Sequence, residues 1–261
     1  MDYLNKLNEL YKKNNIYKAP LHSECKYSGL CWKNVAEERI CKNTEEYAQL
    51  YVPYIGEKYD EARIMAIGIN LHEYGGYNAQ LELAKTARQQ IANGRKRTFA
   101  NSGYQGSLVW HRIVAYTTFI LREFNHIETP VDRPYPLLHE VDKSFDYIAV
   151  TNSIKCSPWG ERSKPTQKMW EHCYDFILKQ EIRILQPKHL IVLGIENFSN
   201  IKGLFDKIEI EDDRYQAKLF KGVLDSMEIL IYVFPHPTSS QGTSLKRLDD
   251  IEHLVYGYCN K

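Results

Sequence analysis

Four short apolar segments, separated by stretches with helical periodicity, limit what this chain can fold into. They cover residues 63–69, 147–151, 189–194 and 228–234. Apolar, β-favouring runs of this length predict buried strands. Strands that alternate with helices predict a doubly wound, mainly parallel sheet. We therefore expect an α/β fold with three layers, α/β/α, around a central, mainly parallel four-stranded sheet.

The length of 261 residues suits one α/β domain with its own core. We predict a single domain over residues 1–261, with a helical, cysteine-bearing N-terminal extension over about residues 1–60. Residues 125–146 are proline-rich and are predicted to be irregular. Residues 195–228 are predicted to hold a short helix and a hairpin-like segment. Helices are predicted over residues 3–14, 79–93, 108–124, 166–185 and 244–258.

Polar residues follow three of the four predicted strands at the point where each strand ends. They are Asn70, Asn152 and His236. The carboxyl ends of parallel strands lie along one edge of the sheet, which is where open α/β sheets bind their ligands. An asparagine after a strand is more often a turn former or a helix cap, but three such residues together predict a common pocket.

The overall charge and hydropathy of the chain exclude some functional classes. The formal net charge is +1, so any attraction to nucleic acid must come from local clusters of basic residues. No apolar run approaches the roughly 20 residues that a membrane span needs. The N-terminal residues lack the apolar core of a secretory signal. We expect a cytoplasmic protein that does not bind membranes.

Five of the six cysteines are grouped in two parts of the sequence. Cys25, Cys31 and Cys41 lie near the N-terminus, whereas Cys156 and Cys173 follow the second predicted strand. A lone cysteine is usually a small buried hydrophobic residue. In a cytosolic chain of this size, however, clustered thiols indicate metal ligands rather than a disulfide framework.

The segment after the second strand carries an ordered motif. Asn152, Lys155 and Cys156 are followed by Pro158, Arg162 and Pro165, and then by Cys173 on the next predicted helix. Further along, a proline precedes a strand that ends in Leu-Gly at residues 187–194, and His-Pro-Thr occupies residues 236–238. In this order, across residues 63–245, the chain resembles the uracil-DNA glycosylase superfamily and most closely its iron–sulfur (family 4) branch.

The chain departs from that branch in its first motif. The iron–sulfur branch has Gly-Glu-x-Pro-Gly there, whereas this chain has Gly-Ile-Asn at residues 68–70, which is similar to the mismatch-specific branch. Leu71 replaces the usual proline, and Glu161 stands where the second motif has asparagine. About 30 residues separate Asn70 from Phe99, which is longer than the family's usual spacing.

The resemblance implies a fold of the uracil-DNA glycosylase type and a role for each matching residue. Asn70 would position the attacking water, and His236 would donate a hydrogen bond to the O2 atom of the leaving pyrimidine. Asn152 would bind the edge of the base, and Phe99 would stack on it, with Tyr104 as the alternative. Phosphate contacts beside the pocket would come from four basic residues: Lys155, Arg162, Lys246 and Arg247.

The resemblance also implies a 4Fe–4S cluster, with zinc as the lesser alternative because thiolates suit both. Cys156 and Cys173 match the family's second pair of ligands. Cys25, Cys31 and Cys41 offer three candidates for the remaining two positions, and we slightly favour Cys25 and Cys31. Cys259 has no counterpart in the family.

We therefore expect a monofunctional DNA glycosylase that removes uracil or a related modified base from DNA and acts as a monomer. One alternative is a glycosylase-like protein that binds nucleic acid without turnover, which the departures at Leu71 and Glu161 favour. A weaker alternative is a zinc-stabilised α/β protein of unrelated function.

Overall fold

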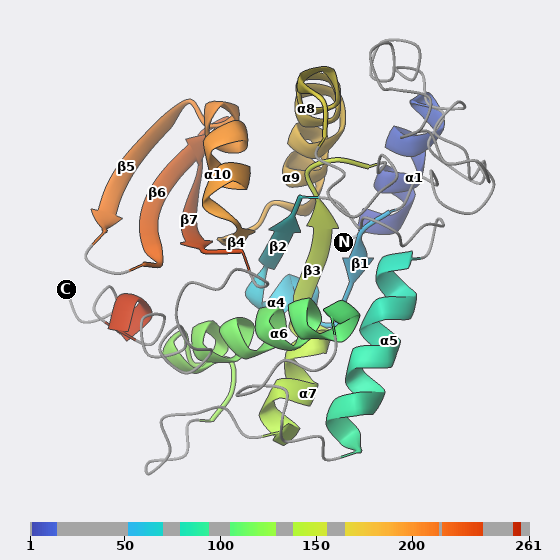
Figure 1. Ribbon diagram of the computed structural model, residues 1–261, viewed down its shortest axis with the longest axis vertical. Helices are drawn as coiled ribbons and strands as arrows, with labels where there is room; N and C mark the ends of the chain where they lie inside the picture. Colours follow the sequence, from blue (N-terminus) through green and yellow to red (C-terminus); the bar gives the residue numbers. More distant parts are fainter. Residues whose placement is uncertain are drawn as a thin grey trace.

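In the part of the chain that the structure describes, a mixed sheet of seven strands forms the centre of the molecule (Figure 1). The computed structural model describes residues 2–14, 52–69, 79–93, 105–128, 138–155, 165–213, 216–236 and 253–256. The strands follow one another in the order β1-β3-β2-β4-β7-β6-β5. Their bounds are Tyr54–Ile55 (β1), Ile64–Gly68 (β2), Ile148–Asn152 (β3), His189–Leu193 (β4), Lys207–Asp212 (β5), Lys218–Leu224 (β6) and Met227–Phe234 (β7).

The four strands predicted from the sequence lie side by side and parallel, as β3, β2, β4 and β7. The prediction that the sheet has only four strands is wrong, because three antiparallel strands extend it. β1 has two residues, too few for an apolar run. β5 and β6 extend the sheet at the opposite edge, on the left of Figure 1, and β5 is a largely exposed edge strand in which charged residues outnumber apolar ones.

Helices cover both faces of this sheet, so the three-layer architecture is confirmed. One layer packs on the core cluster that includes Met65, Leu190 and Ile231, and the other packs on the cluster that includes Ile64, Ile191 and Tyr232. Alternate residues of each strand therefore face opposite layers. The first layer consists of α1 (Tyr3–Lys13), α8 (Gln167–Cys173), η4 (Tyr174–Leu178), α9 (Lys179–Leu185), α10 (Ile195–Ile201) and η5 (Lys202–Leu204). The second consists of α5 (Ala79–Ala92), α6 (Gln105–Glu123), α7 (Leu138–Tyr147) and a helical turn at 253–256.

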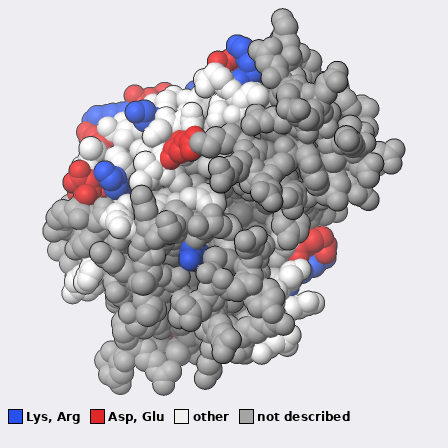
Figure 2. Space-filling model, in the orientation of Figure 1, with Lys and Arg blue, Asp and Glu red and all other residues white. Residues whose placement is uncertain are grey.

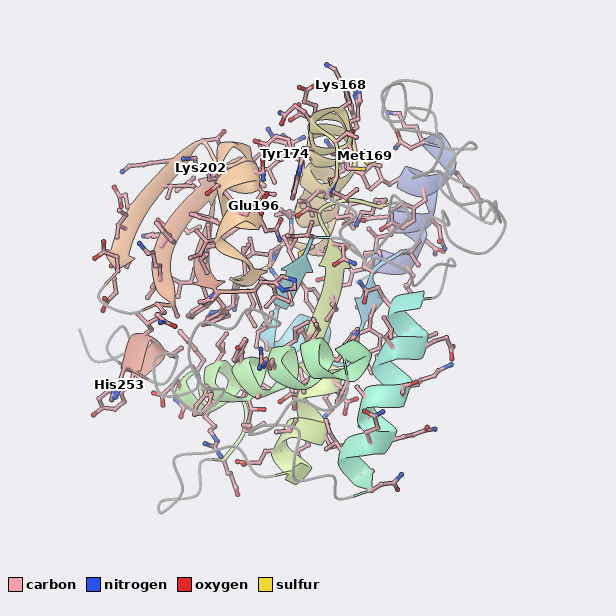
Figure 3. The ribbon with its side chains drawn as sticks, in the orientation of Figure 1. Lys168, Met169, Tyr174, Glu196, Lys202 and His253 are labelled. Atoms are coloured by element: carbon pink, nitrogen blue, oxygen red, sulfur yellow. The ribbon has the colours of Figure 1, made fainter. Side chains whose placement is uncertain are left out.

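The predicted helix over 166–185 forms, but with a π-helical turn, η4, between α8 and α9. Thr166 caps its start by accepting a hydrogen bond from the backbone N–H of Met169 at 3.2 Å. η4 packs against η5: a Cβ at Gly203 would lie 2.7 Å from the Tyr174 hydroxyl. Figure 3 labels Met169 and Tyr174 on α8–η4 and Lys202 on η5. Glycine at position 203 thus allows the two helical segments to approach closely.

Helix α7 was not expected, because residues 125–146 were predicted to be irregular. The prolines that suggested this, Pro130, Pro134 and Pro136, all precede the helix. Within α7, Val141 and Phe145 are four residues apart and fully buried, which is the spacing of one helical face. The short helix α4 (Tyr59–Ala62) precedes β2 and was not predicted either.

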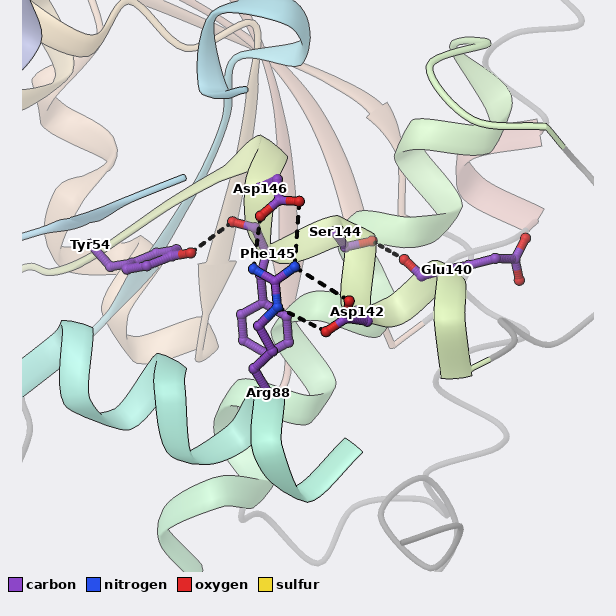
Figure 4. Close-up of polar contacts among 7 residues, drawn as sticks. All are labelled: Tyr54, Arg88, Glu140, Asp142, Ser144, Phe145 and Asp146. Carbon is purple, nitrogen blue, oxygen red and sulfur yellow. Dashed lines mark hydrogen bonds and ion pairs between the residues drawn. The ribbon is translucent and has the colours of Figure 1, made fainter. Parts of the chain in front are cut away.

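Arg88 attaches α5 to α7 through a pair of carboxylates (Figure 4). Its Nε donates to Asp142 and its Nη1 to Asp146, each at 2.8 Å, and its guanidinium lies over the Phe145 ring. The Tyr54 hydroxyl donates to the Phe145 carbonyl at 3.0 Å, which adds β1 to the same group. These contacts fix α5, the first described element after Asn70.

Among the described residues, no helix combines the length and apolarity needed to cross a membrane.

Candidate active site

The carboxyl ends of the four parallel strands are level with one another. Gly68, the last residue of β2, pairs with Asn152, the last residue of β3, and Leu193 of β4 pairs with Phe234 of β7. His236 follows β7 by two residues. The structure therefore places Asn152 and His236 at the same edge of the sheet. This edge was predicted from the polar residues that follow the strands in the sequence.

The side chain of Asn152 is buried, with 4% of the residue exposed, and it lies over β2. A Cβ atom at Gly68 would be 2.2 Å from the Oδ1 atom of Asn152, so only glycine leaves room for this amide. The Nδ2 atom of Asn152 is buried and has no hydrogen-bond partner among the described residues. A buried donor without a partner costs about 1–3 kcal/mol, which a ligand with an acceptor atom would recover.

His236 is half-buried and lies beside the end of β4. A Cβ at Gly194 would be 3.8 Å from the Cδ2 atom of His236. Gly194 has φ of 101°, a conformation that side-chain-bearing residues rarely adopt, and its N–H donates to the Phe234 carbonyl at 2.8 Å. Three strand spacings, roughly 14 Å in total, separate β3 from β7. Asn152 lies over β2 and His236 beside the end of β4, so the two side chains are placed over the neighbouring strands between β3 and β7.

Comparison with known families identifies the fold to which these strand ends belong. A family model described as the uracil DNA glycosylase superfamily matches residues 57–254, more than half of the chain. The chain belongs to the uracil DNA glycosylase superfamily. Members of this superfamily are generally DNA glycosylases. A search among curated proteins found no match to the chain. The match confirms the resemblance to the superfamily, whereas the assignment to its iron–sulfur branch stays a prediction.

Lys155 does not have the position that the superfamily motif suggested. The residue is fully buried, and its Nζ lies 2.7 Å from Oε2 of Glu181 on α9 and also donates to the Thr151 hydroxyl. The same carboxylate accepts from Thr151 at 2.9 Å and from the Tyr11 hydroxyl of α1 at 2.7 Å. These contacts contradict the prediction that Lys155 binds DNA phosphate, because a side chain enclosed by protein atoms cannot reach a phosphate. Lys155 instead joins the segment after Asn152 to α9 and α1.

Of the predicted metal ligands, the described part of this superfamily member contains only Cys173. It is a buried residue on α8, in the core cluster that also contains Tyr3, Leu7 and Tyr11 of α1. The N-terminal segment with the first three cysteines follows α1 in the sequence. Cys25, Cys31, Cys41 and Cys156 lie outside the described residues, as does Cys259. Within the described ranges, no group of three or more potential ligands is found.

The other predicted site residues lie outside the described ranges. They are Asn70, Phe99, Tyr104, Arg162, Lys246 and Arg247. Figure 2 shows described basic and acidic side chains interspersed on one face of the molecule. This agrees with the net charge of +1 and leaves the predicted phosphate contacts to Arg162, Lys246 and Arg247.

Two buried polar residues at or below this edge were not singled out from the sequence, namely Glu181 and Asn197. Both are 0% exposed. Each lies within an ordinary helical pattern, where a charged or amide side chain is usually at the surface. The only signal in the sequence is that each falls on the apolar face of its helix: Glu181 is four residues before Leu185, and Asn197 is four residues before Ile201.

Proposed function

We propose that this protein is a monofunctional DNA glycosylase that hydrolyses the N-glycosidic bond of uracil or a related modified base flipped out of DNA. The observation that carries the proposal is the buried amide of Asn152, which has a donor without a partner and lies at the same sheet edge as His236. An enzyme that acts on a base within DNA must first bring that base out of the stack and into a pocket.

Asn152 and His236 would have different roles: one binds the base, and the other helps the glycosidic bond to break. The Asn152 amide would bind the edge of the base, and its unpartnered N–H group suits a carbonyl acceptor rather than an exocyclic amino group. When the glycosidic bond breaks, a pyrimidine takes negative charge on O2, and a hydrogen bond from His236 would stabilise that charge. Neither role requires Lys155.

The remaining roles fall to residues outside the described ranges and follow from membership of the superfamily. Asn70 would position the water that attacks the sugar, and Phe99, or Tyr104 in its place, would stack on the base. Arg162, Lys246 and Arg247 would contact phosphates beside the pocket. The insertion between Asn70 and Phe99, which contains α5, would help determine which base the pocket accepts.

A panel of oligonucleotides containing uracil, hypoxanthine or modified pyrimidines, followed by alkaline cleavage at abasic sites, tests this function. We expect wild type to release at least one of these bases. Because Asn152→Ala and His236→Ala each remove a group that acts on the base in the transition state, we expect rates lower by about 10²–10³-fold. His253→Ala, which changes an exposed histidine, is the matched control and should retain the wild-type rate.

Two other outcomes would contradict the proposal. Binding of the oligonucleotides without any base release would favour the alternative of a nucleic-acid-binding protein without turnover. Base release that persists in His236→Ala at the rate of His253→Ala would remove His236 from the chemistry. The panel is to be run with single-stranded and duplex substrates, because unpaired bases are easier to flip.

We also propose that Cys156 and Cys173, with two of Cys25, Cys31 and Cys41, hold a 4Fe–4S cluster. The burial of Cys173 in a cluster shared with α1 supports it, because α1 precedes the segment with the N-terminal cysteines. The cluster would have a structural role, holding the N-terminal segment against the loop after Asn152. Soft thiolate ligands are also compatible with zinc.

Metal analysis and absorption spectroscopy of anaerobically purified protein distinguish the two metals. We expect a brown protein with iron and inorganic sulfide, and loss of both in Cys173→Ser because a thiolate ligand is removed. Cys259→Ser, which changes a cysteine without a family counterpart, should keep the iron content. A colourless protein with stoichiometric zinc would contradict the iron–sulfur cluster, and a protein with neither metal would contradict a metal site altogether.

A further inference from the structure

Asn197 connects the ends of three neighbouring strands through one fully buried amide. It lies on α10, the helix that follows β4, and is 0% exposed. Its Nδ2 donates to the Ile67 carbonyl of β2 at 3.2 Å and to the Leu193 carbonyl of β4 at 3.4 Å. Its Oδ1 accepts a hydrogen bond from the Ser153 hydroxyl, directly after β3, at 2.7 Å.

Gly194, the N-cap residue of α10, lies next to the fourth parallel strand, β7. A Cβ at Gly194 would have the Cβ of Asn197 at 3.7 Å and the Cδ2 of His236 at 3.8 Å as its nearest neighbours. Gly194 itself is bonded to β7 through its N–H and the Phe234 carbonyl, at 2.8 Å. Asn197 is therefore hydrogen-bonded to the residue next to Asn152 on one side, and on the other it lies three residues after the glycine that is next to His236.

Strand pairing does not require these contacts. The backbone ladder between β2 and β3 is continuous up to Gly68 and Asn152, and the ladder between β2 and β4 is continuous up to Ile67 and Val192. An apolar residue at position 197 would fill the same space but would allow the strand ends to shift. Directional hydrogen bonds inside a protein instead specify one arrangement, because each buried group that loses its partner is costly.

We infer that Asn197 is a positioning residue that sets the spacing between the Asn152 amide and the His236 ring. The inference rests on the proposed glycosylase function, in which both groups must contact the same base. Misplacement of catalytic groups by about 1 Å lowers rates by as much as 10²-fold. In this proposal Asn197 does not touch the substrate and acts only through the strand ends that its amide holds, at Ile67, Leu193 and Ser153.

Single-turnover kinetics with an oligonucleotide that wild type cleaves provide the first test. We expect Asn197→Ala to lower the rate constant of base release by about 10- to 100-fold. The amplitude of the reaction reports the fraction of active enzyme and is evaluated separately. Ser153→Ala is the milder change at the other end of the same hydrogen bond, and it should also lower this rate constant. Asn200→Ala is the matched control, because Asn200 lies on the same helix but on its outer side, where it donates to the Glu196 carbonyl.

The side-chain amide signals of Asn152 provide a second test that does not depend on activity. In spectra of ¹⁵N-asparagine-labelled protein, assigned from the signals missing in Asn152→Ala, we expect these resonances to move in Asn197→Ala and Ser153→Ala and to stay in place in Asn200→Ala. The inference would be overturned if the Asn152 resonances did not move in these two variants, or if the variants released the base with the wild-type rate constant. If wild type releases no base, the proposed function fails, and the resonances alone decide the role of Asn197.

Discussion

We expect Gly68→Ala to lower the rate of base release by about 100-fold while the protein remains folded. The added Cβ would lie 2.2 Å from the Oδ1 atom of Asn152, and the next nearest atom, Cγ of the same side chain, is 3.4 Å away. The conflict is therefore with the end of one side chain, which can rotate away. Rotation would turn the Asn152 amide from the position that we propose for the base. Rate constants from single-turnover kinetics measure this effect.

A double-mutant cycle separates displacement of Asn152 from a general disturbance of β2. If the amide carries the effect, Gly68→Ala should add little to the loss already caused by Asn152→Ala. Equal losses in both backgrounds would mean that the alanine acts elsewhere. Urea unfolding is the accompanying control, in which we expect a loss of about 1–3 kcal/mol, as for other modest overpacking.

We expect Lys155→Met to lower the free energy of unfolding by about 3–5 kcal/mol, because it leaves a buried carboxylate without its cation. Lys155 is paired with Glu181 at 2.7 Å, and both side chains are at most 1% exposed. Tyr11 and Thr151 remain as partners of the carboxylate but carry no compensating charge. The matched control is Lys168→Met, which removes an exposed pair with Glu171 and should leave the unfolding free energy close to that of wild type.

The double variant Lys155→Met/Glu181→Gln should be less destabilised than the sum of its single variants, because neither charge is then left alone. DNA affinity measured at several salt concentrations provides a further check. A phosphate contact would contribute to the salt dependence of binding, so we expect its slope to be unchanged in Lys155→Met. Stability of Lys155→Met equal to that of Lys168→Met, or a smaller salt slope, would contradict the buried ion pair.

The parallel part of the sheet could be predicted closely because its strands are continuous apolar runs. The strands predicted at 63–69 and 189–194 form at Ile64–Gly68 and His189–Leu193. The hairpin-like segment predicted within residues 195–228 forms as β5 and β6, but the sequence did not show that edge strands would join the sheet. β1 has only two residues, and β5 is largely polar, so their pairing depends on neighbours that are distant in sequence.

In the candidate site, too, features that depend on local sequence were predicted, and contacts between distant residues were not. The positions of Asn152 and His236 followed from the sequence, because the end of a buried strand is a local feature and parallel strands end at one edge. Lys155 was expected to contact phosphate, because it matches the superfamily motif that follows Asn152. Its partner Glu181 lies 26 residues away along the chain, and no local pattern indicates that the two side chains meet.

The sequence by itself determined the four parallel strands at the centre of the sheet, their alternation with helices and the polar residues at the sheet edge. These properties depend on hydrophobic periodicity and on short motifs, which are local. Only the tertiary structure decided that Gly68 makes room for Asn152, that Asn197 joins three strand ends and that Lys155 is buried against Glu181. Such contacts form between residues far apart in the chain, because they depend on how the layers pack rather than on the order of the residues.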